Sequence, residues 1–228
     1  QIAFRKGHYE ILKLLLKQKG DFVLDRDSEG RNVLFYACQR GNIEWLSILI
    51  KDLQRRQLTP EEQSAYLHDG LCFACKNGQI EVVTMILQDR HQLTTNIINE
   101  TFDNGYTCLS LACLYKHYEV CLWLLQQTDL DANIANRNYN TAFTIACIGR
   151  TKILNLMLEM SSDRKIDLNH VDSKGRTGFI RACQGKDEDT VNLLVTNSVK
   201  YNIDLNVKDN AGKSGYDYWP KKFPNHFE

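Results

Sequence analysis

The chain has 228 residues, and its 28 lysines and arginines balance its 28 aspartates and glutamates. A neutral total charge disfavours a general nucleic-acid binder, because such proteins carry a strong basic field. No apolar run approaches the roughly 18 residues that a membrane-spanning helix needs, so no such helix is predicted.

A pair of small residues, alanine followed by cysteine, recurs along the chain. The alanines of the six copies, the first with phenylalanine in the cysteine position, are Ala3, Ala37, Ala74, Ala112, Ala146 and Ala182. Successive copies lie 34 to 38 residues apart. A period in this range indicates a stacked array of supersecondary elements.

Turn-forming residues precede the small pairs, and apolar residues follow them. Asn169, Asp172 and Gly175 stand three apart before Ala182, which suits a tight turn finger in which glycine takes a positive φ. After a pair, as in residues 82–87, apolar residues are spaced three and four apart, which predicts one apolar helix face. Each repeat therefore consists of a finger, a short first helix, a turn and a longer second helix.

In chain order we expect six repeats and a half-repeat within one continuous domain, residues 1–228. The predicted bounds are 1–26, 27–58, 59–98, 99–132, 133–168 and 169–205, followed by the half-repeat 206–228. The first repeat lacks a finger, so we expect further residues before it in the parent protein. The half-repeat stops at Pro220, because proline ends helical structure.

The repeat at residues 59–98 is the least regular. Thr59, Pro60 and Glu62 form the sequence pattern of a capping box, with proline at the first helical position. We therefore expect a helix where the other repeats have a finger. Gly70 is expected to interrupt or end this helix before Cys75.

The repeat resembles the ankyrin repeat, whose pattern joins a finger containing glycine and threonine to a short helix with two adjacent small residues. The segments Gly105–Cys113 and Gly175–Cys183 match it closely. Cysteine replaces the second alanine, and the proline and histidine of the family's Thr-Pro-Leu-His element are missing from every copy. The resemblance implies an all-α ankyrin-repeat solenoid of about six helix-turn-helix units with β-turn fingers, a truncated N-terminal unit and a C-terminal half-repeat cap.

The five cysteines of the small pairs are expected to be buried and reduced, because buried cysteine behaves as a small hydrophobe. Reduced thiols are typical of the cytoplasm, which we predict as the location, with the nucleus as an alternative. Cys72 and Cys75, with His68 one turn earlier, have a spacing that metal sites use. Cys75 belongs to a small pair, however, so core packing explains it, and we expect no metal and no cofactor.

Sequence motifs for catalysis are not found. Gly212, Lys213 and Ser214 resemble the end of a phosphate-binding loop, but the glycine required five residues before Gly212 is Val207. No motif pairs a nucleophile with a base. We therefore predict that the chain is not an enzyme.

The resemblance places partner contacts on a concave surface, built from the finger tips and the residues after the small pairs. The predicted partner-binding residues are Arg31, Arg40, Lys76, Tyr106, Leu114, Tyr115, Asn140, Lys174, Arg176 and Lys213. All positions of this kind together hold nine basic and two acidic residues, so we expect a protein partner with an acidic segment.

Three functions remain open on the sequence. The first is a non-catalytic scaffold for protein–protein interaction, acting as a monomeric domain of a longer chain. The second is the targeting or regulatory ankyrin arm of a larger multidomain enzyme or channel. The third, which the neutral total charge disfavours, is binding of anionic lipid or nucleic acid by the basic concave surface.

Overall fold

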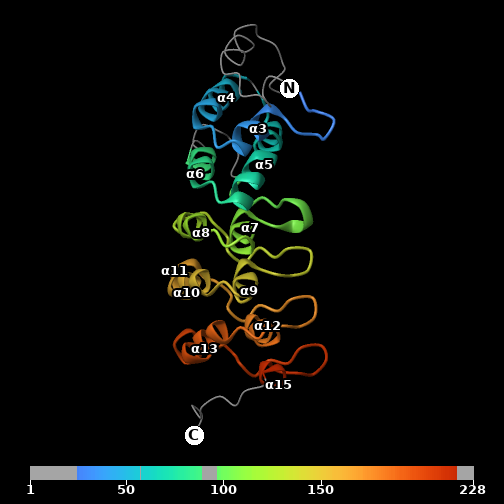
Figure 1. Ribbon diagram of the computed structural model, residues 1–228, viewed down its shortest axis with the longest axis vertical. Coiled ribbons are helices and arrows are strands. Elements are labelled where there is room, and N and C mark those ends of the chain that lie inside the picture. The colour runs from blue at the N-terminus through green and yellow to red at the C-terminus, as the bar shows by residue number, and fades with distance from the viewer. Residues whose placement is uncertain (1–24, 57, 89–96, 220–228) are drawn as a thin grey trace. The chain divides into compact units, whose positions relative to one another are not determined.

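The computed structural model describes residues 25–56, 58–88 and 97–219 (Figure 1). Every regular element in this part of the chain is a helix, which confirms the all-α class. No helix of the described segments is long and apolar enough to cross a bilayer. The chain divides into two compact units, residues 1–102 (unit 1) and residues 103–228 (unit 2). The continuous domain expected from the sequence stays a prediction.

The described residues of unit 1 contain two pairs of helices. They are α3 (Val33–Gln39), α4 (Ile43–Arg55), α5 (Pro60–Asn77) and α6 (Ile80–Gln88). The first helices α3 and α5 pack on each other, and the second helices α4 and α6 form the adjacent layer (Figure 1). Trp45, Leu49 and Ile86 are fully buried between them, so the apolar spacing read from the sequence marks the core.

Helix α5 begins as predicted but does not end where expected. The Thr59 N–H donates to Glu62 Oε2 at 2.8 Å, and the Glu62 N–H donates to Thr59 Oγ1 at 3.3 Å, which completes the capping box. The expectation that Gly70 interrupts the helix is wrong, because α5 runs through it for 18 residues. A Cβ at Gly70 would lie 2.6 Å from Leu34 Cδ2 and 2.7 Å from Cys38 Sγ, so this glycine permits close packing of α5 on α3.

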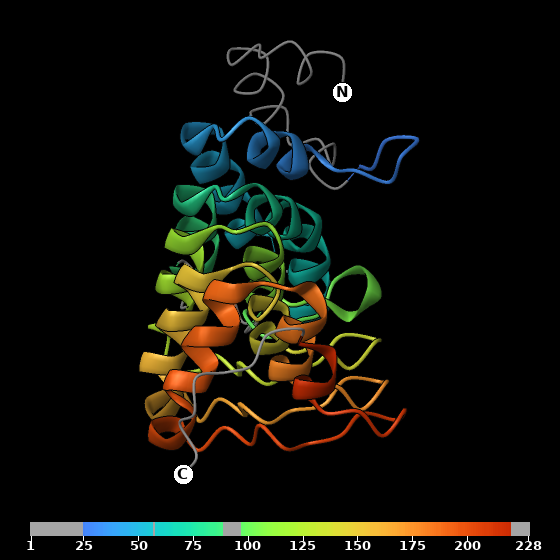
Figure 2. The ribbon, with the colours of Figure 1, turned by 60° about the horizontal axis from the view of Figure 1, so that its bottom comes forward.

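Unit 2 contains three complete finger-and-helix-pair repeats and a final first helix within its described residues. Its elements are η3 (Asp103–Gly105), α7 (Cys108–Leu114), α8 (Tyr118–Leu125), α9 (Ala142–Ala146), α10 (Thr151–Glu159), α11 (Ser161–Arg164), α12 (Gly178–Gly185), α13 (Glu188–Thr196), α14 (Ser198–Tyr201) and α15 (Gly215–Tyr218). The first helices α7, α9, α12 and α15 form one row, with the second helices on one side and the fingers on the other (Figures 1 and 2).

The first helices start regularly without the missing proline and histidine. Thr107, Thr141 and Thr177 each accept a hydrogen bond from the backbone N–H three residues later. Asn32 does the same for α3 in unit 1. Threonine and asparagine are strong N-caps, so these side chains supply the helix start signal that the family's proline usually gives.

Asparagine side chains join successive repeats of unit 2. Asn169 Nδ2 donates to the carbonyl of Asn202 at 2.9 Å, and Asn169 Oδ1 accepts from the N–H of Asp204 at 2.8 Å. Asn133 makes the same two bonds to the following repeat, at 2.9 and 2.8 Å. Each amide thus satisfies one backbone carbonyl and one N–H of its neighbour, which fixes the register between repeats.

Arg150 links two first helices from the short turn after α9. Its Nε donates to the carbonyl of Cys113 at 2.9 Å and its Nη2 to that of Leu114 at 2.8 Å, both at the C-terminus of α7. Its Nη1 donates to the carbonyl of Ile145, in the last turn of α9, and to that of Ile148, just after the helix. The last carbonyls of a helix have no partner within the helix, and a cation there also complements the helix dipole.

The cysteines of the small pairs are buried and form no disulfide in the described repeats, as predicted. They are Cys38, Cys75, Cys113, Cys147 and Cys183. Burial raises the pKa of the Cys183 thiol to about 12, and it raises the pKa of Cys147 further. These two thiols therefore stay protonated at neutral pH, and they pack as apolar side chains.

Candidate functional site

A buried aspartate fixes the finger before α12. Asp172 is 5% exposed, and its Oδ1 accepts from the N–H groups of Lys174 at 2.9 Å and Arg176 at 3.0 Å. Its Oδ2 accepts from Arg176 Nε at 2.9 Å and from Arg181 Nη1 at 3.0 Å. Burial opposes ionisation of Asp172, but the bonds from Arg176 and the backbone hold its pKa below the usual value. The carboxylate therefore locks the turn.

The finger before α3 in unit 1 uses the same arrangement. Asp27 Oδ1 accepts from the N–H groups of Glu29 and Arg31, both at 2.9 Å. Asp27 Oδ2 accepts from the Tyr36 hydroxyl and from Arg31 Nε. The Tyr36 bond is the main reason that the pKa of Asp27 is lowered.

The two remaining fingers of this kind, before α15 and before α9, use variants of the same hydrogen bonding. Asp209 accepts from the N–H groups of Ala211 at 2.9 Å and Lys213 at 3.1 Å, and from the Tyr218 hydroxyl at 2.6 Å. In the finger before α9, asparagine replaces aspartate, and Asn136 Oδ1 accepts from the N–H of Asn140 at 3.0 Å. All four fingers are held from inside by one side chain.

Three residues predicted to bind a partner belong to these internal networks. Asn140 is 8% exposed and its Oδ1 accepts from Arg181 Nη1, so its side chain is not part of an exposed surface. Arg31 and Arg176 are half-buried and donate to the aspartates of their own fingers. Their charges are largely neutralised inside the fold.

The exposed members of the predicted set lie at finger tips and first-helix ends. In unit 1, Arg40 is the C-cap of α3 and Lys76 lies in the last turn of α5, and both are exposed. In unit 2, Tyr115 is the C-cap of α7 and is 42% exposed, and Lys174 and Lys213 are exposed on their fingers. Tyr106 and Leu114 are half-buried. Their role in binding stays a prediction.

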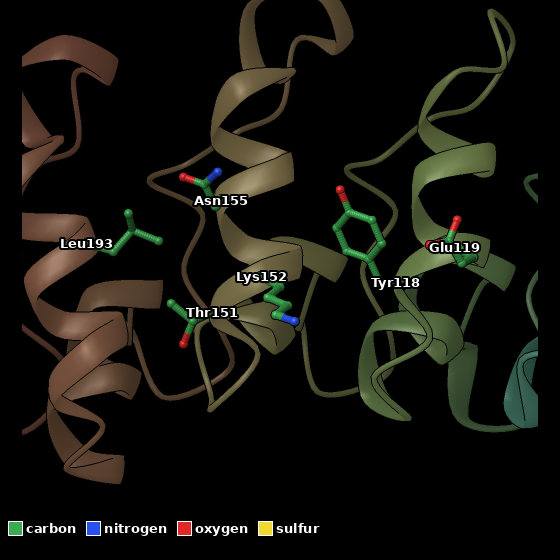
Figure 3. A pocket seen from close by; sticks show the side chains of 6 residues that line it. All are labelled: Tyr118, Glu119, Thr151, Lys152, Asn155 and Leu193. Atoms are coloured by element: carbon green, nitrogen blue, oxygen red, sulfur yellow. The ribbon is translucent and has the colours of Figure 1, made fainter.

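The opposite side of unit 2 carries a shallow hollow across the second helices. It has a volume of about 710 Å³, and Figure 3 shows its lining side chains from α8, α10 and α13. They are Tyr118, Glu119, Thr151, Lys152, Asn155 and Leu193. The sequence reasoning considered only the inner apolar face of these helices and missed this hollow. The charged groups in this lining are the Glu119 carboxylate and the Lys152 ammonium group, and they do not form the pair of nucleophile and base that catalysis requires.

Metal or acid–base chemistry has no support in the geometry. Within residues 25–56, 58–88 and 97–219, no three histidine, cysteine or carboxylate side chains gather as metal ligands. His68 lies against Asp69, at 3.4 Å, and against the ring of Phe102. That bond to Asp69 raises the pKa of His68, and Asp69 also binds Arg26 at 2.8 Å, so the cluster is an ion-pair network.

Comparison with known families decides the classification. A model of ankyrin repeats in three copies matches residues 1–59 and 56–136. The chain belongs to the ankyrin-repeat family. The family model thus covers more than half of the chain, and the repeating fingers and helix pairs described above agree with it.

Curated relatives match between 61% and 64% of this chain. The I-Kappa-B like protein C2 of Microplitis demolitor bracovirus is 27% identical over 147 residues, which are 61% of this chain and 78% of that protein. The E3 ubiquitin-protein ligase XBAT33 of Arabidopsis thaliana is 27% identical over 169 residues, 64% of this chain and 32% of the ligase. The probable ligase XBOS33 of Oryza sativa subsp. japonica is 26% identical, over 64% of this chain and 28% of its own length. The chain thus spans about a third of these ligases.

One finger-tip residue of this ankyrin-repeat chain escaped the sequence reasoning. Tyr139 occupies the position seven residues before a small-pair alanine, where other described fingers have Gly30, Gly105 and Gly175. It has a φ of 58° and is 62% exposed. Aligning the repeats on their alanines would have revealed it, since tyrosine in a glycine position is unusual.

Proposed function

We propose that this ankyrin-repeat chain is a non-catalytic scaffold that binds a protein partner on its finger tips and first-helix ends. Ankyrin repeats are protein-interaction modules, and the observation that carries the finer proposal is the exposure of Tyr115. The residue is 42% exposed and lies at the C-cap of α7. Tyrosine and arginine on rigid, exposed positions are typical of binding hot spots.

Rigid support makes such a surface effective. The Tyr115 N–H donates to the carbonyl of Leu111 at 3.0 Å, so the residue continues the hydrogen bonding of α7. The finger aspartates Asp27, Asp172 and Asp209 fix the turns beside the first helices. Little conformational entropy is then lost on binding, so more of the contact energy appears as affinity.

An acidic partner segment suits the exposed charges. Arg40 and Lys76 lie at the same ends of neighbouring helices in unit 1, and Lys174 and Lys213 lie on neighbouring fingers in unit 2. Arginine can hold a carboxylate through two parallel hydrogen bonds. The absence of disulfides among the described cysteines is consistent with a reducing compartment, and we propose the cytoplasm as the location, with the nucleus as the alternative.

The test is a titration of purified variants against the partner recovered from a native lysate and identified by mass spectrometry. Tyr115→Ala and Arg40→Glu should each weaken binding by about 2 kcal/mol or more, which is about 30-fold in Kd. The matched control is Lys152→Glu, on the second-helix hollow of unit 2, which should change Kd less than about threefold. Loss of binding only in Lys152→Glu would refute the proposal.

A second candidate is a targeting or regulatory arm within a larger enzyme. The observation in its favour is that the matched repeats make up only 28% and 32% of two plant proteins named as ubiquitin ligases. In that arrangement the finger tips would still bind a protein, and another part of the molecule would act on it. The sequence of the full-length protein distinguishes this candidate from a free-standing scaffold.

A further inference from the structure

Tyr139 stands out among the finger tips of unit 2. Its φ of 58° lies in the left-handed region, and among the described residues outside glycine it is the only aromatic with a positive φ. The residue is also 62% exposed to solvent. A bulky residue in this backbone conformation is an outlier, and such outliers gather at binding sites.

The neighbouring fingers show why glycine suits this position. A Cβ at Gly105 would come within 3.0 Å of the Arg137 nitrogen in the next finger, and a Cβ at Gly175 would come within 2.4 Å of Asn210 Oδ1. Tyrosine at the equivalent position 139 therefore works against the backbone preference, in a row of fingers that leaves little room at this position. The free-energy cost of tyrosine in this conformation calls for a favourable interaction that offsets it.

That favourable interaction is not found inside the described fold. The backbone of Tyr139 is fixed, since its N–H donates to the carbonyl of Asn136 at 2.8 Å and its carbonyl accepts from His170 Nε2 at 2.9 Å. Its ring and hydroxyl have no hydrogen-bond or ring contact with the residues described in the structure. A fixed backbone with an outward ring is the arrangement of a binding anchor, because tyrosine offers large area at low entropy cost.

The charges around Tyr139 indicate the partner's chemistry. At the described finger tips of unit 2, the exposed charged residues are Arg137, Lys174 and Lys213 and one carboxylate, Asp103. The segments that lead into these fingers add the exposed carboxylates of Asp131, Asp167 and Asp204. The carboxylates of Asp172 and Asp209 are buried inside the fingers. The tips therefore present an excess of positive charge on either side of the tyrosine.

The fingers also form a continuous row. The N–H of Arg137 donates to the carbonyl of Asn104 at 2.9 Å, that of Ser173 to Asn138 at 3.2 Å, and that of Asn210 to Lys174 at 3.0 Å. Figure 2 shows the fingers before α9, α12 and α15 extending side by side away from the helices. A row of tips joined in this way suits an extended chain that crosses several fingers.

We propose that Tyr139 is the anchor by which the unit 2 fingers hold an extended acidic segment of a partner protein. An apolar side chain of the segment packs on the ring, and flanking carboxylates pair with Arg137 and Lys174. The inference rests on the proposed scaffold function and adds to it the specificity-determining residue and the chemistry of the ligand.

The test uses 12-residue random peptides displayed on phage and selected against the whole chain. The selected peptides are synthesised with a fluorescent label, and their Kd values for variants are measured by anisotropy. We expect aspartates or glutamates flanking an apolar residue in the selected sequences. Tyr139→Gly should weaken binding at least tenfold, while Tyr139→Phe should stay within about threefold.

A stability measurement separates an anchor from a structural tyrosine. If glycine fits position 139 better, Tyr139→Gly should raise Tm by about 2–4 °C, the shift expected for relief of modest backbone strain in a chain of this size. Weaker binding together with a higher Tm would support the anchor. A lower Tm would show that the ring stabilises the fold and would overturn the inference.

The remaining outcomes are equally decisive. Unchanged affinity of Tyr139→Gly, with affinity lost in Tyr115→Ala, overturns the anchor and leaves the proposed scaffold surface standing. Affinity lost only in Lys152→Glu overturns both. Selected peptides without acidic residues, or no peptide with a Kd below about 100 µM, overturn the acidic-segment assignment.

Discussion

Arg150 should be one of the residues on which the stability of unit 2 depends most. Its guanidinium donates to the carbonyls of Cys113 and Leu114 from α7, of Ile145 in the last turn of α9 and of Ile148 just after it. We predict that Arg150→Met, which keeps much of the aliphatic stem, destabilises the folded state. The cause is that the ends of two first helices lose their common donor.

The magnitude follows from two opposing contributions. A hydrogen bond from a charged donor contributes about 1.5–3 kcal/mol, and Arg150 makes several. Burial disfavours the charged guanidinium, as its lowered pKa shows, and water can reach some of the carbonyls at this half-buried position. A net cost of about 2–4 kcal/mol results. Arg150→Lys should lose at least half as much, because one ammonium group cannot span both helix ends.

The assay is urea unfolding followed by far-ultraviolet circular dichroism, with stability read from the midpoint at unchanged m-value. The matched control is Arg137→Met, an exposed arginine on a finger of the same unit, which should change stability by less than about 0.5 kcal/mol. A cost for Arg150→Met below about 1 kcal/mol, or equal to that of Arg137→Met, would refute the reasoning.

Two further predictions concern unit 1 and the core thiols. Thr59→Ala should cost about 1 kcal/mol in urea unfolding, because it removes the capping box of α5; an unchanged midpoint would contradict this. Cys183→Ser should cost about 1–3 kcal/mol by leaving a hydroxyl poorly satisfied in the core. Because the pKa of Cys183 is about 12, its thiol should react slowly with maleimide at pH 8 in the folded protein, and rapid labelling detected by mass spectrometry would show that it is accessible.

Sequence reasoning succeeded where the physical cause is local. The three-and-four spacing of apolar residues and the capping box at Thr59 each depend on residues within one repeat, and the buried cysteines occupy one recurring position of the repeat. Helix starts also follow local rules. The side chains of Thr107 and Thr141 each accept a hydrogen bond from the backbone N–H three residues later and so cap their helices.

Several of the errors and omissions involve neighbours in an adjacent repeat. Gly70 was expected to break α5, yet it is the contact point for Leu34, 36 residues earlier. Asn140 was expected on the binding surface, yet Arg181, 41 residues later, binds its side chain. The role of Arg150 depends on carbonyls 36 and 37 residues earlier. Such pairs cannot be seen from spacing within one repeat.

Basic residues in this fold consequently serve two purposes that the sequence does not separate. Arg31, Arg176 and Arg181 donate to finger aspartates, and their charges are matched within a few ångströms. Only cations whose side chains leave the finger, such as Arg137 and Lys174, add to the field that a partner meets. A count of all basic finger positions therefore overestimates the attraction of the surface for an acidic segment. Contacts made by exposed rings must supply the remaining affinity, which is why a tyrosine in a glycine position carries more information about binding than the charge does.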